Sequence, residues 1–383
     1  MSIGPRQPKL DLTRESARQH WSEAGLIPSS PIARGVTIDT WRIPMKPRDY
    51  VLAQIHHHET HPVPYSLAFD DGTDTMLDDY YGSPAWRERL IAYMVNVGGV
   101  DTIQHEPVDD IHERDAFGGL WRLDRRPWHL ERPPLQEPSF DNYDFPTPDR
   151  FLNTTLKQSA RKVMEAHPDS FSIVGAGWGL FELSWRIRGF ENALMDAIVE
   201  PDFYAELLDR LTELFLAHVE QCTDVPADAI MFGDDWGDQR SVILGPERWR
   251  KFIKPRWARV YEAVHAQGKL VISHCCGSIA DIMPDIIEIG LDVLESVQPE
   301  AAGMNPYQLK KKWGDKITFY GGLGSQSTIQ FGTPQDIHDE VKRLCQEMGR
   351  GGGYILHPAK AIQPGTPVEN AVAVFEAFTT QDW

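Results

Sequence analysis

The sequence predicts an α/β protein built as a single (β/α)8 (TIM) barrel. Short apolar runs alternate with segments of helical periodicity over the C-terminal half of the chain. These runs are apolar throughout, which is typical of parallel strands covered on both faces. Neither GxGxxG nor GxxxxGK[ST] follows the first predicted strands. Strict alternation without a nucleotide-binding motif favours a closed barrel over an open, doubly wound sheet.

The 383 residues are long for one core, but barrels with insertions reach this length. Residues 1–45 carry mixed charges and several prolines without a long periodic segment, so we interpret them as an irregular N-terminal extension with one short helix near 13–24. Residues 46–383 then form the barrel. The segment 125–148 is dense in proline and aromatic residues and predicts a long loop, which in a compact domain is usually functional or wraps the surface.

The elements follow in order from FSIVGAG, an apolar run that ends in glycines. The segment 201–221 is a predicted helix with proline at its first position, and 246–268 is a helix bent near Pro255 with a glycine just past its end. The remaining predicted helices are 279–290, 305–314, 333–349 and 368–378. The predicted strands are 171–177, 229–232, 270–273, 292–297, 317–322 and 354–356, with VPYSLAF (63–69) as an early candidate.

Charge and cysteine content exclude several classes of partner. Lys plus Arg number 38 against 56 Asp plus Glu, a net charge of −18 that disfavours nucleic acid and anionic membranes as partners. There is no run of about eighteen apolar residues and no secretory signal at the N-terminus. Four cysteines, two of them adjacent, do not form a disulfide framework, so we predict a cytoplasmic protein.

Polar side chains follow five of the predicted strands, and in barrels the reacting groups gather at these C-terminal ends. The segments are Asp234-Asp235-Trp236, His274-Cys275-Cys276, Gln298, Leu323-Gly324-Ser325-Gln326 and His357-Pro358-Ala359-Lys360. We predict catalytic roles for Asp234, Asp235 and Lys360, and substrate binding by Trp236, Gln298, Gln326 and His357. Alternatively, either aspartate caps a loop turn, and the tryptophan is a core residue.

His274 and Cys276 form a candidate zinc site. Side chains two apart on a strand point the same way, so both can face the barrel mouth while Cys275 faces away. An imidazole and a thiolate can fill two of the four positions around zinc. The alternative is that both are packed residues at a strand end. Arg186 and Arg188, beside Trp185, are suited either to an acidic substrate group or to the surface.

Taken in order, these motifs resemble the uroporphyrinogen decarboxylase superfamily. The resemblance is carried from about 171 to 378 by FGDDWGDQ, HCCGSI, FYGGLGSQ, GGGYILHP and IQPGTPVENA, and more loosely by HPVPYSLAFD and DAFGGLW in the front half. It implies a (β/α)8 barrel. The superfamily contains true uroporphyrinogen decarboxylases and zinc-dependent methyltransferases that work with corrinoid proteins, coenzyme M or folates, and its members often form homodimers.

The sequence looks closer to the methyltransferase branch, whose zinc motif is His-x-Cys with a distant cysteine on the last strand. His274 and Cys276 match the first two ligands, but Lys360 lies in the segment where the third is expected. A protonated lysine cannot bind zinc, so His357 or Asp234 replaces the cysteine, or the metal is absent. The arginine-rich segment of the decarboxylase branch is missing from HPVPYSLAFDD, although Asp234 aligns with that branch's aspartate.

Three functions therefore stand as hypotheses. In the first, a methyltransferase moves a methyl group between a small substrate and a corrinoid, thiol or folate, using zinc, one of the aspartates and Gln326, with a corrinoid protein as partner and a homodimer as the family's usual state. In the second, a metal-independent lyase decarboxylates a small acid that Lys360 and an aspartate hold. In the third, the barrel binds a small molecule without chemistry.

Overall fold

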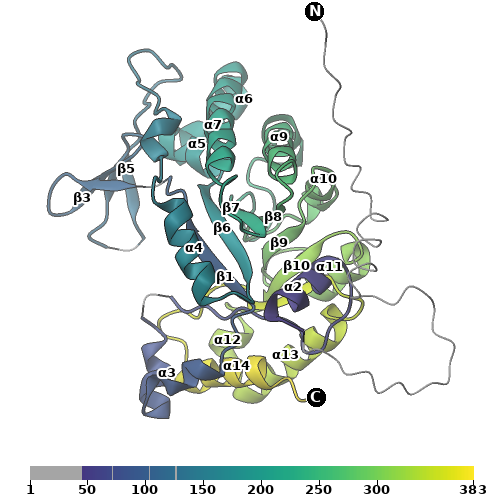
Figure 1. Ribbon diagram of the computed structural model, residues 1–383. Helices are drawn as coiled ribbons and strands as arrows, with labels where there is room; N and C mark the ends of the chain where they lie inside the picture. The colour runs from purple at the N-terminus through teal and green to yellow at the C-terminus, as the bar shows by residue number, and fades with distance from the viewer. Residues whose placement is uncertain (1–44, 71, 103, 126) are drawn as a thin grey trace, which may run out of the picture. The chain divides into compact units, whose positions relative to one another are not determined.

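The computed structural model describes residues 45–70, 72–102, 104–125 and 127–383. Seven parallel strands form one sheet in the order β1-β6-β7-β8-β9-β10-β11 (Figure 1). Every residue of β9, β10 and β11 is buried, which confirms that the apolar runs are strands covered on both faces. The strands are β1 (Met94–Gly99), β6 (Phe171–Trp178), β7 (Ala229–Gly233), β8 (Leu270–His274), β9 (Val293–Val297), β10 (Thr318–Leu323) and β11 (Tyr354–Pro358).

Helices connect successive strands, and the predicted helix 201–221 is confirmed as α7 (Pro201–Gln221). Proline occupies the first turn of α7 and of several other helices, where its missing N–H is not needed. The other α-helices are α2 (Pro47–Ile55), α3 (Thr75–Tyr81), α4 (Leu156–Ala166), α5 (Leu180–Arg188), α6 (Phe190–Val199), α8 (Pro246–Arg248), α9 (Lys254–His265), α10 (Met283–Glu288), α11 (Pro306–Trp313), α12 (Thr328–Phe331), α13 (Pro334–Met348) and α14 (Val368–Thr380). Short 3₁₀ turns are η1 (Pro84–Arg89), η2 (Pro148–Phe151) and η4 (Ala280–Ile282).

The predicted bend in the helix 246–268 is present as a π-helical turn, η3 (Trp249–Ile253), between α8 and α9. Pro255 is the second residue after this turn, at the start of α9. Because proline has no N–H to donate to the carbonyl four residues earlier, the regular α-helical ladder is interrupted there.

The early candidate strand at 63–69 is only partly formed, whereas β1, which was not predicted from the sequence, is the first strand of the sheet. In place of a continuous strand at 63–69, two isolated parallel bridges join Tyr65 to Leu356 and Phe69 to Ile362. Within the described ranges, no backbone hydrogen bond joins this segment to β1. The predicted α/β fold with a parallel sheet is confirmed, and the sheet has seven strands. Closure of this sheet into a full (β/α)8 barrel is not observed among the described residues.

A small antiparallel sheet, which the sequence analysis did not predict, precedes η2. It contains β2 (His105–Pro107), β3 (His112–Asp115), β4 (Leu120–Arg122) and β5 (His129–Arg132), paired in that order. Figure 1 shows it projecting beside α5. Strands of three or four residues are too short to give a detectable alternation. Part of the predicted loop 125–148 is therefore strand β5.

Residues 1–44, most of the predicted N-terminal extension, lie outside the described residues, as does the short helix predicted within it. The boundary between this extension and the barrel therefore stays a prediction. Among the described helices, none combines the length and apolar character needed to cross a bilayer.

Candidate metal centre

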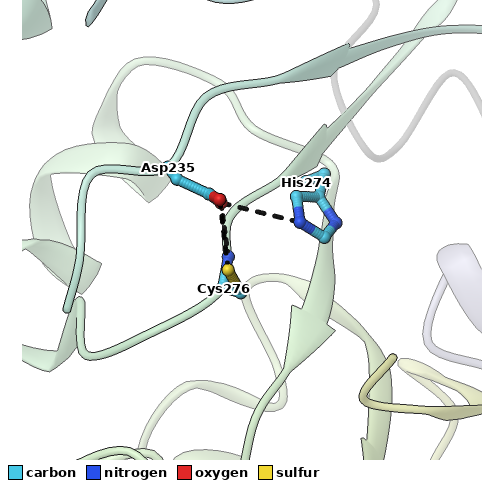
Figure 2. Close-up of side chains that lie close together, drawn as sticks. All are labelled: Asp235, His274 and Cys276. Carbon is cyan, nitrogen blue, oxygen red and sulfur yellow. Dashed lines mark hydrogen bonds and ion pairs between the residues drawn. The ribbon is translucent and has the colours of Figure 1, made fainter. Parts of the chain in front are cut away.

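Three side chains converge at the C-terminal ends of the neighbouring strands β7 and β8. Oδ2 of Asp235 lies 3.2 Å from Sγ of Cys276, and Oδ1 of Asp235 lies 3.5 Å from Nε2 of His274. One ligand atom from each residue lies within 4.8 Å of the other two. Figure 2 shows the carboxylate near both the imidazole and the thiol. In the part of the chain that the structure describes, this is the one such group of three His, Cys, Asp or Glu side chains.

The register between the two strands explains this convergence. Gly233 pairs with His274, so Asp235 and Cys276, two residues further along each strand, extend from the same side of the sheet. The backbone N–H of Cys276 also donates to Oδ1 of Asp235 at 2.9 Å. Cys275 is fully buried, and its Sγ accepts the backbone N–H of Trp236 at 3.2 Å. The expectation that Cys275 faces away from the site is confirmed.

A buried carboxylate orients the imidazole. Nδ1 of His274 is in contact with Oε2 of Glu295 on β9, so Nε2 is the nitrogen that faces Asp235. Glu295 is 7% exposed, and its Oε1 lies 4.0 Å from Nδ1 of His357. A histidine that ligates a metal usually donates its second N–H to such a carboxylate, which fixes the ring and the tautomer. Glu295 was not predicted from the sequence, although an acid within an apolar strand is an available signal.

The protonation of these groups follows from burial and mutual charge. Burial opposes charge on His274, but Glu295, Cys276 and Asp235 together outweigh it and raise the pKa of the imidazole well above its ordinary value. Burial would raise the pKa of Glu295, yet the charge of His274 lowers it. Burial raises the pKa of the Cys276 thiol, and Asp235 adds to this effect. Without a metal, the centre therefore contains an imidazolium and a neutral thiol.

The donor set and its spacing fit zinc. Sulfur, imidazole nitrogen and carboxylate oxygen are all common zinc ligands. Bonds of about 2.0–2.3 Å at tetrahedral angles place donors roughly 3.3–3.6 Å apart. One carboxylate oxygen of Asp235 lies 3.2 Å from Sγ of Cys276 and the other lies 3.5 Å from Nε2 of His274, and one ligand atom from each of the three residues lies within 4.8 Å of the other two. Three protein ligands leave one tetrahedral position for a substrate, which is typical of catalytic zinc.

Asp234, unlike Asp235, has a structural role. It is fully buried, and its carboxylate accepts the backbone N–H groups of Phe181 at 3.2 Å and Glu182 at 3.0 Å, in the first turn of α5. It also accepts the indole N–H groups of Trp236 at 2.7 Å and Trp257 at 2.9 Å. Burial raises its pKa to about 6 in spite of these donors. With four donors on two oxygens, Asp234 anchors α5 and is an unsuitable replacement ligand.

The glycine before α5 makes this anchoring possible. Gly179 is the N-cap residue of α5 and supplies no capping side chain. A Cβ atom at this position would lie 2.3 Å from Cβ of Asp234. Asp234 therefore occupies the space of a cap side chain and satisfies helix N–H groups that would otherwise lack acceptors.

The other predicted site residues are not brought into the cluster. Trp236 is 1% exposed and packs against Trp249 and Trp257, so it offers no surface to a substrate in this structure. Gln298 is 4% exposed and accepts the backbone N–H of Gly277 at 3.0 Å. Both side chains have structural contacts, and their predicted binding roles stay untested.

His357, Gln326 and Lys360 differ in their surroundings. His357 is 7% exposed beside Tyr320 and Glu295, and burial lowers its pKa, so it adjoins the site through Glu295. Gln326 is exposed, with its backbone N–H on Glu300. Lys360 is also exposed, and no hydrogen bond or ion pair joins its side chain to another described residue. Asp235, rather than His357 or Asp234, is the side chain that the structure brings together with His274 and Cys276, and the ligand prediction itself stays a prediction.

Helix α5 carries Glu182, which interacts electrostatically with Asp235 and His274, and Arg186, which the sequence offered as a binding group for an acidic substrate. Glu182 is 6% exposed, and one of its carboxylate oxygens is buried without a hydrogen-bond partner. Burial raises its pKa to about 9, and the charges of Asp235 and Asp234 add to the effect. Arg186, one turn later, is surrounded by indole rings. Arg188, in contrast, is 3% exposed in an ion pair with Asp196, so it is neither at the surface nor free for a substrate.

A parallel α/β fold with polar side chains gathered at its C-terminal strand ends is typical of barrel enzymes. The sequence profile of the family described as Uroporphyrinogen decarboxylase (URO-D) matches residues 123–381, more than half of the chain. The chain therefore belongs to the uroporphyrinogen decarboxylase family. The resemblance inferred from the motifs is confirmed.

Relatives from both branches of this family match the chain. Methylcobamide:CoM methyltransferase MtaA of Methanosarcina barkeri is 26% identical over 208 residues, covering 54% of this chain and 57% of the relative. Uroporphyrinogen decarboxylase of Coxiella burnetii is 25% identical over 181 residues, covering 46% of this chain and 47% of the relative. The matches thus span about half the length of these relatives.

The solved structure of a methyltransferase from Methanosarcina mazei has a similar fold. Its TM-score is 0.65 at 20% sequence identity, and the match covers 87% of this chain and 98% of that one. At this identity the likeness supports the fold alone.

Proposed function

We propose that the chain is a zinc-dependent methyltransferase that acts on a small molecule. The observation that carries the proposal is the convergence of Asp235, His274 and Cys276, with Nδ1 of the histidine held by Glu295. Sulfur, nitrogen and oxygen donors around one point are the ligand set of a catalytic zinc site with one open position. A buried carboxylate behind the histidine adds the usual support for such a ligand.

The relatives support methyl transfer as the reaction. One of them is described as acting between methylcobamide and CoM, so we take a corrinoid as the methyl carrier, with a corrinoid protein as the partner that presents it. A folate carrier and a homodimer stay predictions from the family resemblance. We also take residues 63–69, which form two bridges to the β11 side of the sheet, to complete the barrel.

Each residue of the centre has a distinct role in this proposal. Zinc would supply a Lewis acid that activates a thiol or polarises a methoxyl oxygen. Glu295 holds the imidazole so that Nε2 faces Asp235, and Asp235 is itself held by the backbone N–H of Cys276. The imidazolium and the thiol must each lose a proton when a metal binds, so zinc affinity rises with pH.

The metal-free decarboxylase remains the alternative because uroporphyrinogen decarboxylases are among the matching relatives. It assigns the substrate carboxylate to Lys360, whose side chain is exposed. Under that alternative, Lys360→Ala abolishes turnover and Cys276→Ser has a mild effect. Under the methyltransferase proposal, the two effects are reversed.

The deciding experiment measures metal content and methyl transfer together. We expect about one zinc per chain in freshly purified protein and its loss in Cys276→Ser, because the hydroxyl replaces a preferred sulfur ligand. Cys345→Ser is the matched control, since this cysteine lies on α13 outside the cluster. Methyl transfer from methylcobalamin to coenzyme M, followed by the cobalamin absorbance change, should be lost in the first variant alone. Purified protein without metal, or equal zinc in both variants, would refute the proposal.

A further inference from the structure

Arg186 on α5 lies among three tryptophan side chains from different parts of the chain. Its guanidinium carbon is 4.6 Å from the ring centroid of Trp121 on β4, 5.5 Å from that of Trp185 on α5 and 5.9 Å from that of Trp178 at the end of β6. Attraction to the faces of indole rings holds a guanidinium in place without using its N–H groups, which stay available as hydrogen-bond donors.

This cation has no anionic partner. Among the described residues, no carboxylate lies within ion-pair distance of Arg186, and its Nε is buried without a hydrogen-bond partner. Burial lowers its pKa, but an arginine side chain stays charged at physiological pH. Asp115 is close enough to interact electrostatically. Its carboxylate, however, already accepts the backbone N–H groups of Phe117 and Gly119 and the indole N–H of Trp121.

Glu182 does not neutralise the guanidinium either, although it lies one helical turn earlier. Opposite charges at this spacing on a helix ordinarily pair. Here no ion pair forms between them, and Oε2 of Glu182 is buried without a partner. Arg186 thus lies half-buried with no ion-pair partner among the described residues, an arrangement that is costly unless a ligand satisfies the guanidinium.

The tryptophan cluster reaches the metal centre through Gly233. A Cβ atom at Gly233 would lie 3.9 Å from Cβ of His274 and 4.0 Å from Cε3 of Trp178. Gly233 also pairs with Trp178 of β6 on one side and with His274 of β8 on the other, so these two side chains flank a position that has no side chain of its own. Arg186, Trp178 and His274 follow one another across this side of the strand ends.

We propose that Arg186 binds the carboxylate of a small planar organic acid, with the acid's body along the Trp178 ring and its far end toward Asp235, His274 and Cys276. The site is a specificity pocket that selects a carboxylated substrate for the metal centre. Which end of the ligand reacts depends on the proposed function. Binding of the carboxylate by Arg186 does not depend on it.

The test uses benzoate and benzamide as probes, because they share size and shape and differ in charge. Calorimetric titration of the full chain should show saturable binding of benzoate at one site and at least tenfold weaker binding of benzamide. Arg186→Gln should weaken benzoate at least tenfold. Arg343→Gln should leave it unchanged, since Arg343 also stacks on a ring, that of Tyr307, but pairs with Glu347 on exposed α13.

Arg186→Lys keeps the charge without the fork of donors, and intermediate binding is expected; this variant carries the test if Arg186→Gln does not fold. The titrations are repeated on chelator-treated protein. If the chelator-treated protein still binds benzoate and no preparation contains zinc, the result supports the pocket and contradicts only the zinc proposal. Equal affinity for both probes, no saturable benzoate binding, or undiminished binding in both Arg186 variants overturns the pocket, whatever the zinc content.

Discussion

Glu182→Gln should make the protein less sensitive to alkaline pH. The glutamate is 6% exposed, has an unpartnered oxygen and has a pKa raised to about 9 by burial and by the charges of Asp235 and Asp234. The folded protein therefore keeps a proton on this carboxyl group at pH values where the unfolded chain has lost it. Glutamine is a neutral group of nearly the same shape and matches the protonated form.

The sign and size follow from proton linkage. Between pH 4.5, the ordinary value, and about 9, the folded state binds more protons at this position than the unfolded state. The free energy of unfolding then falls as pH rises, by about 1.4 kcal/mol per pH unit at full effect. Over the whole interval this amounts to at most about 6 kcal/mol. Relaxation around a charged carboxylate reduces it, and we expect a difference on the order of a few kcal/mol at pH 8.

The assay is urea unfolding of chelator-treated wild-type protein and Glu182→Gln at one-unit steps from pH 5 to 9. The two midpoints should nearly coincide at pH 5, and the wild-type midpoint should fall below that of the variant as pH rises. Glu165→Gln, at an exposed position on α4, is the control and should follow the wild type. If Glu182→Gln also runs parallel to the wild type over the whole range, Glu182 is ionised in the folded state and the argument fails.

Three further substitutions test the separate roles assigned to the strand-end acids and to Lys360. Asp234→Asn removes a charged acceptor from two helix N–H groups and two indoles, and should lower the free energy of unfolding by about 3–5 kcal/mol in urea titrations; a change below about 1 kcal/mol would contradict the anchoring role. Glu295→Gln should weaken zinc about 10–100-fold in competition with a chromophoric chelator, and unchanged affinity would remove the orienting role. Lys360→Ala should leave zinc content and methyl transfer intact, whereas loss of all turnover would favour the decarboxylase alternative.

Much of the fold could be predicted because its signals are local. The apolar runs from 171 onward and the proline that begins α7 depend only on neighbouring residues, and these elements are confirmed. The short strands β2 to β5 could not be predicted, since three or four residues carry no clear periodicity and their pairing is set by contacts along the whole sheet. The closure predicted at 63–69 depends equally on distant contacts and appears only as two bridges.

The candidate site was predicted in part for the same reason. His274 and Cys276 are two residues apart on one strand, so their common direction follows from strand geometry alone. The contribution of Asp235 requires the register of β7 against β8, which one sequence does not contain. The surroundings of Arg186 depend on Trp121, which the antiparallel sheet supplies from a distant part of the chain.

Asp234 and Asp235, which follow β7 directly, connect helix α5 to the candidate metal centre. Asp234 fastens the start of α5, and Asp235 contacts both other members of the metal centre. One peptide unit, about 3.8 Å between Cα atoms, separates these attachments. Under the two proposals above, an acid that displaced α5 on binding would also displace Asp235, a proposed ligand of the ion. Such a coupling is reciprocal, so metal titrations with and without benzoate, and benzoate titrations with and without metal, should then change by the same factor.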